Sequence, residues 1–186
     1  MAKIDFFRAQ LKGGGARPTQ FRVILAFPDF VQANGAVKAG EFLIKASSLP
    51  ASTIQPIDVP FRGRAAKLAG ERIFANWNVV VLNDNDFLIR NALEAWSKGV
   101  LDHASTGGRI VPASYTADLT VQQLDRNDNP IKEYKFSNCF PQNISEIALD
   151  FGDTTQIEQF QCEFSVDYWE STPVGSNINL SVNIPL

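Results

Sequence analysis

The sequence predicts a mainly β protein, an antiparallel sandwich or partial barrel with one α-helix packed on it. Apolar and polar residues alternate over several segments, most regularly over residues 156–169, as expected of half-buried strands. One segment instead repeats Leu88, Ala92 and Trp96 at four-residue spacing, which is typical of a helix face. Fourteen phenylalanines against one methionine also favour a β core over a helical bundle.

Length, charge and cysteine content restrict the class of protein that this sequence can encode. The 186 residues suit one domain with a substantial core. A net charge of −3 gives no general attraction to phosphate, which disfavours a sequence-independent nucleic-acid binder. Cys139 and Cys162 lack metal-site spacing and are expected to be buried free thiols. No membrane span or signal peptide is recognisable, so synthesis in the cytoplasm is expected.

The elements follow in order along the chain. Residues 1–15 are expected to be a leader, with a short amphipathic helix ended by a glycine hinge. Residues 103–112 are expected to be a loop, and residues 125–130 a turn. The predicted strands are residues 20–27, 41–49, 75–82, 114–124, 131–140, 144–149, 156–169 and 177–185.

The predicted helix has recognisable ends. The run Asn-Asp-Asn-Asp at residues 83–86 supplies N-cap side chains. Lys98 suits the negative end of the helix dipole, and Gly99 is a natural residue just past the end.

Residues 54–74 stand apart from this pattern. Pro56 and Pro60 interrupt an extended run, and Gly63 and Gly70 flank a charged patch. We expect an irregular, exposed excursion that contacts another protein, because mixed charge favours protein contact over a nucleic-acid platform. A solvated loop is the alternative. The predicted contact residues are Asp58, Arg62, Arg64, Lys67, Glu71 and Arg72.

The residues provide no constellation for catalysis. His103 is the only histidine and lies in the predicted loop. The aspartate-rich turn starting at Asp125 fails as a calcium loop, because Pro130 and Phe136 replace the required glycine and glutamate. The sequence therefore predicts no catalytic, cofactor-binding or metal-binding residue, and no enzyme.

Several segments resemble one known family, the tail-tube proteins of large contractile-tailed bacteriophages. The matching segments are ARPTQF at 16–21, SSLPAS at 47–52, AGERIFANWNVVVLND at 69–84, the helix with Ala95-Trp96, and DYWE at 167–170. They delimit an expected tube domain at residues 16–170, followed by an extension at 171–186. The extension alternates well enough to predict an extra strand, on its own sheet or on a neighbour's edge.

The resemblance implies a sandwich-like subunit, six of which form a ring with one continuous inner β-barrel. Rings would stack into a hollow tube inside a contractile sheath, and DNA would leave the capsid through it without specific binding. The implied partners are other copies of the chain, the sheath protein, and baseplate and tail-terminator proteins, all in the virion tail. A baseplate tube initiator or a related injection-system tube is the alternative, and a soluble ligand-binding β-sandwich is the alternative from another class.

Two polar strand faces are candidates for the tube lumen, since neither carries a lysine or arginine that would hold DNA. We expect at least one of them to line the lumen; facing solvent or the sheath is the equal alternative. The first face comprises Thr116, Asp118, Thr120 and Gln122, and the second Gln159, Gln161, Glu163, Ser165 and Asp167.

Overall fold

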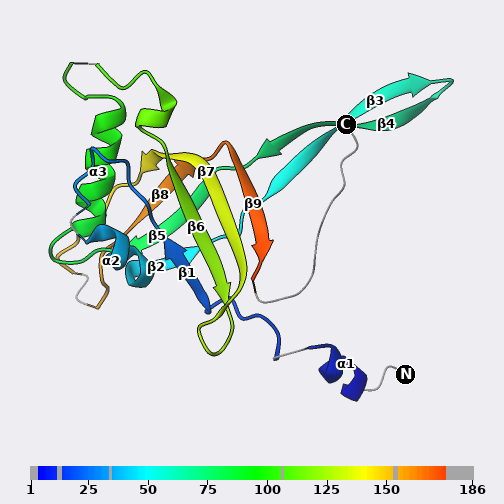
Figure 1. Cartoon of the computed structure of the whole chain (residues 1–186), viewed down its shortest axis with the longest axis horizontal. Helices are drawn as coiled ribbons and strands as arrows, with labels where there is room; N and C mark the ends of the chain where they lie inside the picture. The colour runs from blue at the N-terminus through cyan, green and yellow to red at the C-terminus, as the bar shows by residue number, and fades with distance from the viewer. Residues whose placement is uncertain (1–3, 12–13, 34, 106, 153–154, 175–186) are drawn as a thin grey trace.

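The computed structural model describes residues 4–11, 14–33, 35–105, 107–152 and 155–174. Figure 1 shows a body of antiparallel strands with two helices, labelled α2 and α3, at one side and a long two-stranded hairpin projecting from the other. The mainly β fold class is confirmed, and the sheet does not close into a barrel within one chain. The body strands are β1 (Phe21–Ile24), β2 (Ile44–Ser47), β5 (Trp77–Leu82), β6 (Ala117–Leu124), β7 (Pro130–Ile144), β8 (Gln159–Ser165) and β9 (Tyr168–Pro173).

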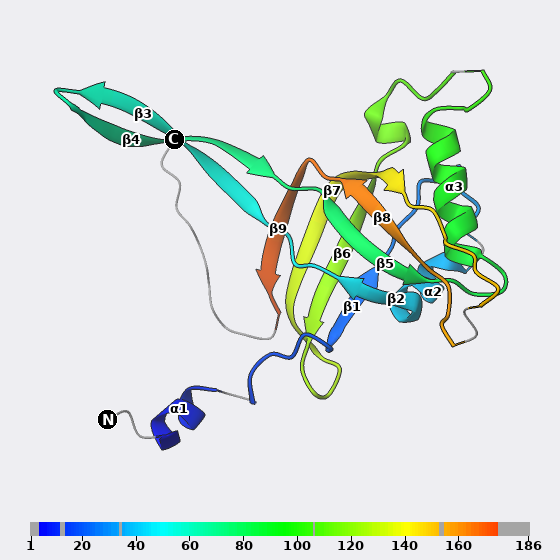
Figure 2. The same cartoon turned by 180° about the vertical axis from the view of Figure 1, so that it is seen from behind.

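One seven-stranded sheet, in the order β1-β6-β7-β8-β5-β2 with β9 also on β7, makes up this body. The first part of β7 pairs with β6 and β9, and its last residues pair with β8. Strand β7 therefore joins two halves, β1-β6-β7-β9 and β7-β8-β5-β2. The first half faces the viewer in Figure 1 and the second in Figure 2, so their outer surfaces point to opposite sides.

A β-bulge lies where β7 passes from one half to the other. The register shifts between the pairs Ala117↔Cys139 and Leu119↔Phe136, and Asn138 has a φ of 55°. Asparagine tolerates this left-handed conformation better than most residues. The Asn138 backbone N–H donates to Asp118 Oδ1 (3.2 Å), and its side-chain Nδ2 donates to Asp167 Oδ2 (3.0 Å). Two carboxylates thus hold the bend.

The core lies between the two halves. Trp77 of β5 stacks on Phe136 of β7, with ring centroids 4.4 Å apart. Cys139 and Cys162 are buried and free, as predicted, and burial raises the pKa of both thiols to about 12. They are therefore protonated, unreactive core residues at neutral pH.

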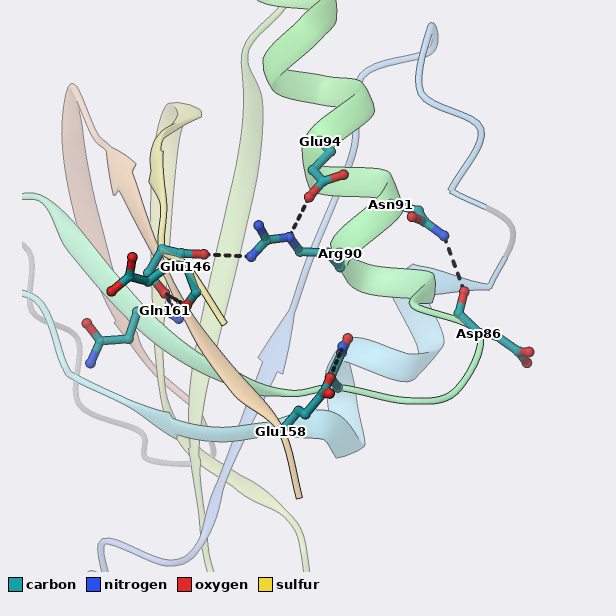
Figure 3. A network of polar contacts seen from close by, with 9 residues as sticks. Asp86, Arg90, Asn91, Glu94, Glu146, Glu158 and Gln161 are labelled. Carbon is teal, nitrogen blue, oxygen red and sulfur yellow. Dashed lines mark hydrogen bonds and ion pairs between the residues drawn. The ribbon is translucent and has the colours of Figure 1, made fainter. Parts of the chain in front are cut away.

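The predicted helix is α3 (Leu88–Val100), which buries Ile89, Ala92, Leu93 and Trp96. Its N-cap residue is Phe87, in a left-handed conformation without a side-chain cap, so the N-cap predicted within residues 83–86 is wrong. Asp84 Oδ1 nevertheless accepts the Leu88 backbone N–H (3.0 Å). Arg90 ties this helix to the sheet: its Nη1 donates to the Ser145 carbonyl (2.7 Å) and its Nε to Glu94 (Figure 3). Arg90 also lies over the Phe160 ring.

Two further α-helices occur in the described residues, together with a 3-10 turn, η2 (Pro112–Ser114). The leader helix α1 (Ile4–Gln10) was expected, whereas α2 (Ala36–Leu43) was not. The predicted strand 41–49 is therefore wrong at its start, and only β2 remains of it. Packing explains this: Ala36 and Gly40 are buried, and a Cβ on Gly40 would lie 3.1 Å from Leu25 Cδ1.

Three other expected boundaries are wrong. Gly99 lies inside α3 instead of just beyond it. The predicted strand 144–149 does not form, because the Ser145 hydroxyl accepts the Gln161 N–H and ends the backbone ladder there. The single strand expected at 156–169 is interrupted between β8 and β9, beside the bulge at Asn138. The strand predicted at 177–185 lies outside the described residues.

Candidate assembly surfaces

The segment expected to be irregular is a regular hairpin of β3 (Ser52–Phe61) and β4 (Arg64–Phe74). Its two-residue turn is Arg62-Gly63, with φ values of 46° and 83°. Two successive left-handed residues are characteristic of the type I′ turn, whose twist suits a hairpin. The excursion's irregularity is therefore a wrong prediction, while its exposure is confirmed.

The base of the hairpin is fixed to the body beside β9. Phe74 meets Trp169 edge to face, with ring centroids 6.0 Å apart, and Trp169 Nε1 donates to the Ala51 carbonyl (3.4 Å). Arg72 Nη1 donates to Ser52 Oγ (3.0 Å) across the two strands. The hairpin thus projects past the β9 side of the body in both views (Figures 1 and 2).

Gly70 permits a bulge near the middle of the hairpin. The register shifts between Ile54↔Arg72 and Pro56↔Ala69. A Cβ on Gly70 would lie 2.5 Å from the Gln55 carbonyl oxygen, so the close approach of the two strands there requires glycine.

Beyond this bulge one face of the hairpin is apolar. The pairs Ile57↔Leu68, Val59↔Ala66 and Phe61↔Arg64 share that face. The side chains of Ile57, Val59, Phe61 and Leu68 are between 42% and 66% exposed. Adjoining exposed apolar side chains of this kind are typical of an interaction surface. We call these four residues the apolar hairpin face. The sequence interpretation missed them, although the alternation Ile57-Asp58-Val59-Pro60-Phe61 signals them.

The six predicted contact residues all lie on the hairpin but do not form one patch. Asp58 pairs with Lys67 on the face opposite the apolar hairpin face. Arg62 lies in the turn over the Phe61 ring, 5.3 Å from its centroid. Arg64 borders the apolar hairpin face, Arg72 is held by Ser52, and Glu71 lies in the bulge.

The hairpin is also electrically distinct from the rest of the chain. It carries four basic and two acidic residues, for a net charge of +2. With 17 basic and 20 acidic residues in the whole chain, 13 basic and 18 acidic ones remain outside it, for a net charge of −5. Opposite charge on two parts of one chain favours contact between copies.

The first candidate lumen face lies on the first half of the sheet. Asp118, Thr120 and Gln122 lie on the outer side of β6, whereas Thr116 precedes the strand and donates its hydroxyl to the Pro112 carbonyl. Neighbouring strands add basic residues that the sequence interpretation did not consider. Arg22 of β1 lies opposite Gln122, and Lys135 of β7 lies opposite Thr120.

Lys135 is neutralised on this face. Its Nζ lies 2.9 Å from Asp118 Oδ2. The hydrogen bond from Lys135 lowers the pKa of Asp118, and the same bond raises the pKa of Lys135. Both groups therefore stay charged and paired around neutral pH. Glu133 and Glu170 add negative charge on the same side, opposite Gln122 and Lys135 respectively.

The second candidate face lies on the outer side of β8, in the other half of the sheet. Gln159 accepts a hydrogen bond from Lys45 (2.9 Å), and Glu163 accepts one from Asn76 (2.8 Å). Gln161 and Ser165 alternate with buried Cys162 and Phe164, as predicted. Asp167 lies between β8 and β9, where it holds Asn138. Because the two halves face opposite sides, at most one of the two candidate faces can line a given bore.

The first half has a further property. Its strand order is β1-β6-β7-β9, and in the described part of the chain neither β1 nor β9 has a partner on its outer side. The strands alternate in direction, so β1 and β9 run antiparallel to each other. A second copy in the same orientation would place its β1 antiparallel to β9 of the first.

No group of three or more potential metal-ligating side chains occurs in the described residues. No helix in that part of the chain is both long and apolar enough to cross a membrane. Comparison with known proteins identifies the family: residues 16–172 match the phage tail tube protein family. The chain belongs to this family.

The relatives share most of their length with the chain. The tail tube protein gp19 of Enterobacteria phage T4 is 31% identical over 171 residues, covering 89% of this chain and 98% of that protein. The tail tube protein of Serratia phage KSP90 is 28% identical over 165 residues, covering 88% and 93%. As a tail tube protein, the chain is a structural component of the virion and not an enzyme.

Solved structures show the same fold. A chain in the sheath–tube complex of an extracellular contractile injection system, in its extended state, superimposes with a TM-score of 0.64 at 13% identity, covering 89% of this chain and 97% of that one. A chain in the baseplate of the anti-feeding prophage gives 0.61 at 16% identity, covering 87% and 97%.

Proposed function

We propose that six copies of this tail tube protein join into a ring, and that rings stack into a hollow tube that conducts DNA inside a contractile sheath. The four-strand half of the sheet carries this proposal, because it has two free edges and an even number of alternating strands. An even number makes every seam between copies antiparallel, so one sheet can continue around the ring and close as a barrel. Closure would also remove two edges that are liabilities in a lone monomer.

This arrangement predicts which of the two candidate faces lines the lumen. The half that closes into the barrel would turn its outer side inward, so Asp118, Thr120 and Gln122 would line the bore. The carboxylates of Asp118, Glu133 and Glu170 would outweigh Arg22 and the paired Lys135, which leaves little attraction for phosphate and suits DNA that must slide. The β8 face, from Gln159 to Ser165, would point outward to the sheath.

The hairpin would contact a copy in the adjacent ring. Its apolar face supplies area to bury, and its positive charge complements the negative remainder of the chain. We assign residues 1–15 to a leader, residues 16–170 to the tube domain and residues 171–186 to an extension, of which residues 171–173 complete β9.

The relatives' names and structures support the choice of partners. Sheath–tube, baseplate and tube-terminating-cap structures all contain chains of this fold. We therefore propose that the sheath protein, the baseplate and a tail terminator contact the assembled tube.

Negative-stain microscopy of the purified full chain at high concentration tests the proposal. Long hollow tubes with six-fold end views are expected. Single rings that never stack would favour a baseplate tube initiator. Compact monomers, even with a baseplate nucleus added, would overturn the proposed assembly.

A further inference from the structure

We propose that the outer edge of β4 binds an extended backbone segment of a second copy of this chain by strand addition, and that the outer edge of β3 is closed to such binding. This inference rests on the proposed assembly and specifies how the hairpin takes part in it. The observations that carry it are the register of the hairpin and the positions of two prolines.

The turn determines which backbone groups are free. In a hairpin with a two-residue turn, the flanking residues, here Phe61 and Arg64, form a hydrogen-bonded pair, and paired positions then alternate. Moving away from the turn, the non-hydrogen-bonded pairs are Pro60↔Ala65, Asp58↔Lys67 and Pro56↔Ala69. The C=O groups of these six residues, and the N–H groups of the four that are not proline, point away from the partner strand, toward the two outer edges.

The β3 edge offers little to a further strand. Two of its three outward positions, Pro56 and Pro60, have no N–H, and only Asp58 can donate. Proline costs the hairpin no ladder bond at these positions. It therefore blocks the edge without weakening the hairpin, a common protection of exposed strands.

The β4 edge lacks this protection. Ala65, Lys67 and Ala69 are all exposed and present three N–H and three C=O groups over five residues. The two alanines leave the approach to the backbone open. A chain that blocks one edge of an exposed hairpin and leaves the other open indicates that the open edge is used.

A second copy of the chain is the occupant that fits. The hairpin has a net charge of +2 and the rest of the chain −5, so another copy attracts it. A strand added beside β4 would also extend the apolar hairpin face, allowing both the backbone and these side chains to contact one neighbour.

Proline substitution on β4 tests the inference, because it would block the β4 edge in the same way as Pro56 and Pro60 block the β3 edge. The double variant Ala65→Pro/Ala69→Pro removes two outward N–H groups and no bond within the hairpin. We expect a folded monomer with wild-type circular dichroism and a concentration threshold for tube formation raised tenfold or more. Ala65→Ser/Ala69→Ser is the matched control, since it changes the same two side chains and keeps both N–H groups and the charge, and it should form tubes at the wild-type threshold.

Hydrogen exchange of the wild-type chain provides a second measurement that needs no variant. The amides of Ala65, Lys67 and Ala69 should exchange rapidly in monomers and become protected in tubes, while the Asp58 amide stays unprotected. Normal tubes from the double proline variant, equal loss from the double serine variant, or unprotected β4 amides in tubes would each overturn strand addition but leave the tube function intact. Failure of the wild-type chain to assemble would instead overturn the proposed function, and this inference with it.

Discussion

At the scale of single residues, Gly99 shows how a missing side chain joins distant parts of the chain. A Cβ on Gly99 would lie 2.0 Å from Phe30 Cε2, so the Phe30 ring occupies the space a side chain would take. Arg109 covers the ring, with its guanidinium carbon 4.1 Å from the ring centroid. The loop before α2, the end of α3 and the loop after it therefore meet at one aromatic ring.

Gly99→Ala should consequently destabilise the fold, although alanine is the better helix former. Displacing Phe30 is expected to cost roughly 1–3 kcal/mol, a typical overpacking penalty. Urea unfolding followed by circular dichroism measures the change. Lys98→Ala, at an exposed position of the same turn, is the control and should stay within about 0.5 kcal/mol of wild type. A Gly99→Ala protein as stable as wild type would show that the ring moves aside freely.

The same position shows where local sequence interpretation fails. Lys98 and Gly99 form a conventional helix end, yet the helix continues past them, whereas it does begin just after the polar run at residues 83–86, with Phe87 as its N-cap residue. The difference is physical: the Asp84 carboxylate reaches the Leu88 N–H within four residues, whereas Phe30 lies about seventy residues from Gly99 in the sequence. Asn138 is similar, because its left-handed backbone is stabilised by Asp118 of β6 and by Asp167 between β8 and β9.

At the scale of elements, the hairpin is the clearest case of tertiary information that the sequence only partly contains. Its exposure and its charges could be predicted from Pro56, Pro60 and the arginines. Its regularity could not, because Arg62 in a left-handed conformation is a rare choice for a type I′ turn. The prolines were interpreted as interruptions, yet they occupy outward positions where they break no ladder bond.

The apolar hairpin face should matter more for assembly than the charges. Phe61→Ser/Leu68→Ser removes two large side chains that are already 66% and 57% exposed in the monomer, so its stability should change little. Burial of each against a neighbour contributes at least about 1.5 kcal/mol, so the double variant should weaken the contact roughly a hundredfold. Sedimentation of assembled tubes measures this loss.

Two further variants distinguish the contribution of buried apolar area from that of charge. Lys67→Ser, on the opposite face, removes one charge and no apolar area, so it should reduce sedimentation much less than the Phe61/Leu68 variant. Arg62→Glu/Arg64→Glu should leave the monomer folded and prevent long tubes, and added salt should weaken assembly of the wild type as well. Normal tubes from the Phe61/Leu68 variant would refute the role of the apolar hairpin face.

At the scale of the whole molecule, the body is a sheet bent at β7 so that one half remains open at both edges. The sequence alternation predicted most of these strands, but strand order and free edges depend on pairings between distant segments. The two polar faces looked equivalent in sequence because both alternate equally well. Only the bend distinguishes them, by placing one face on the open-edged half and the other on the opposite side.

The β9 edge gives a decisive test of the ring. Val174 N donates to the Ile131 carbonyl (3.2 Å), so Ile131 and Val174 form a hydrogen-bonded pair. Hydrogen-bonded and non-hydrogen-bonded pairs alternate along the ladder, so Lys132↔Pro173 and Tyr134↔Ser171 are non-hydrogen-bonded pairs. The backbone groups of Ser171 therefore point outward from β9. Ser171→Pro should therefore remove one N–H from the proposed seam with β1 of the next copy and leave the sheet within the chain intact. We expect folded monomers by mass photometry, whereas Ser171→Thr, which keeps the N–H, should assemble normally.

The stage at which assembly stops distinguishes the seam within a ring from the contact between rings. A seam variant should stop at the monomer, because no ring can close. A variant of the hairpin should form closed rings that do not stack, because its contact lies between rings. Rings of normal size from Ser171→Pro would contradict the β1–β9 seam, and monomers from the Phe61/Leu68 variant would move the hairpin contact from the adjacent ring into the ring itself.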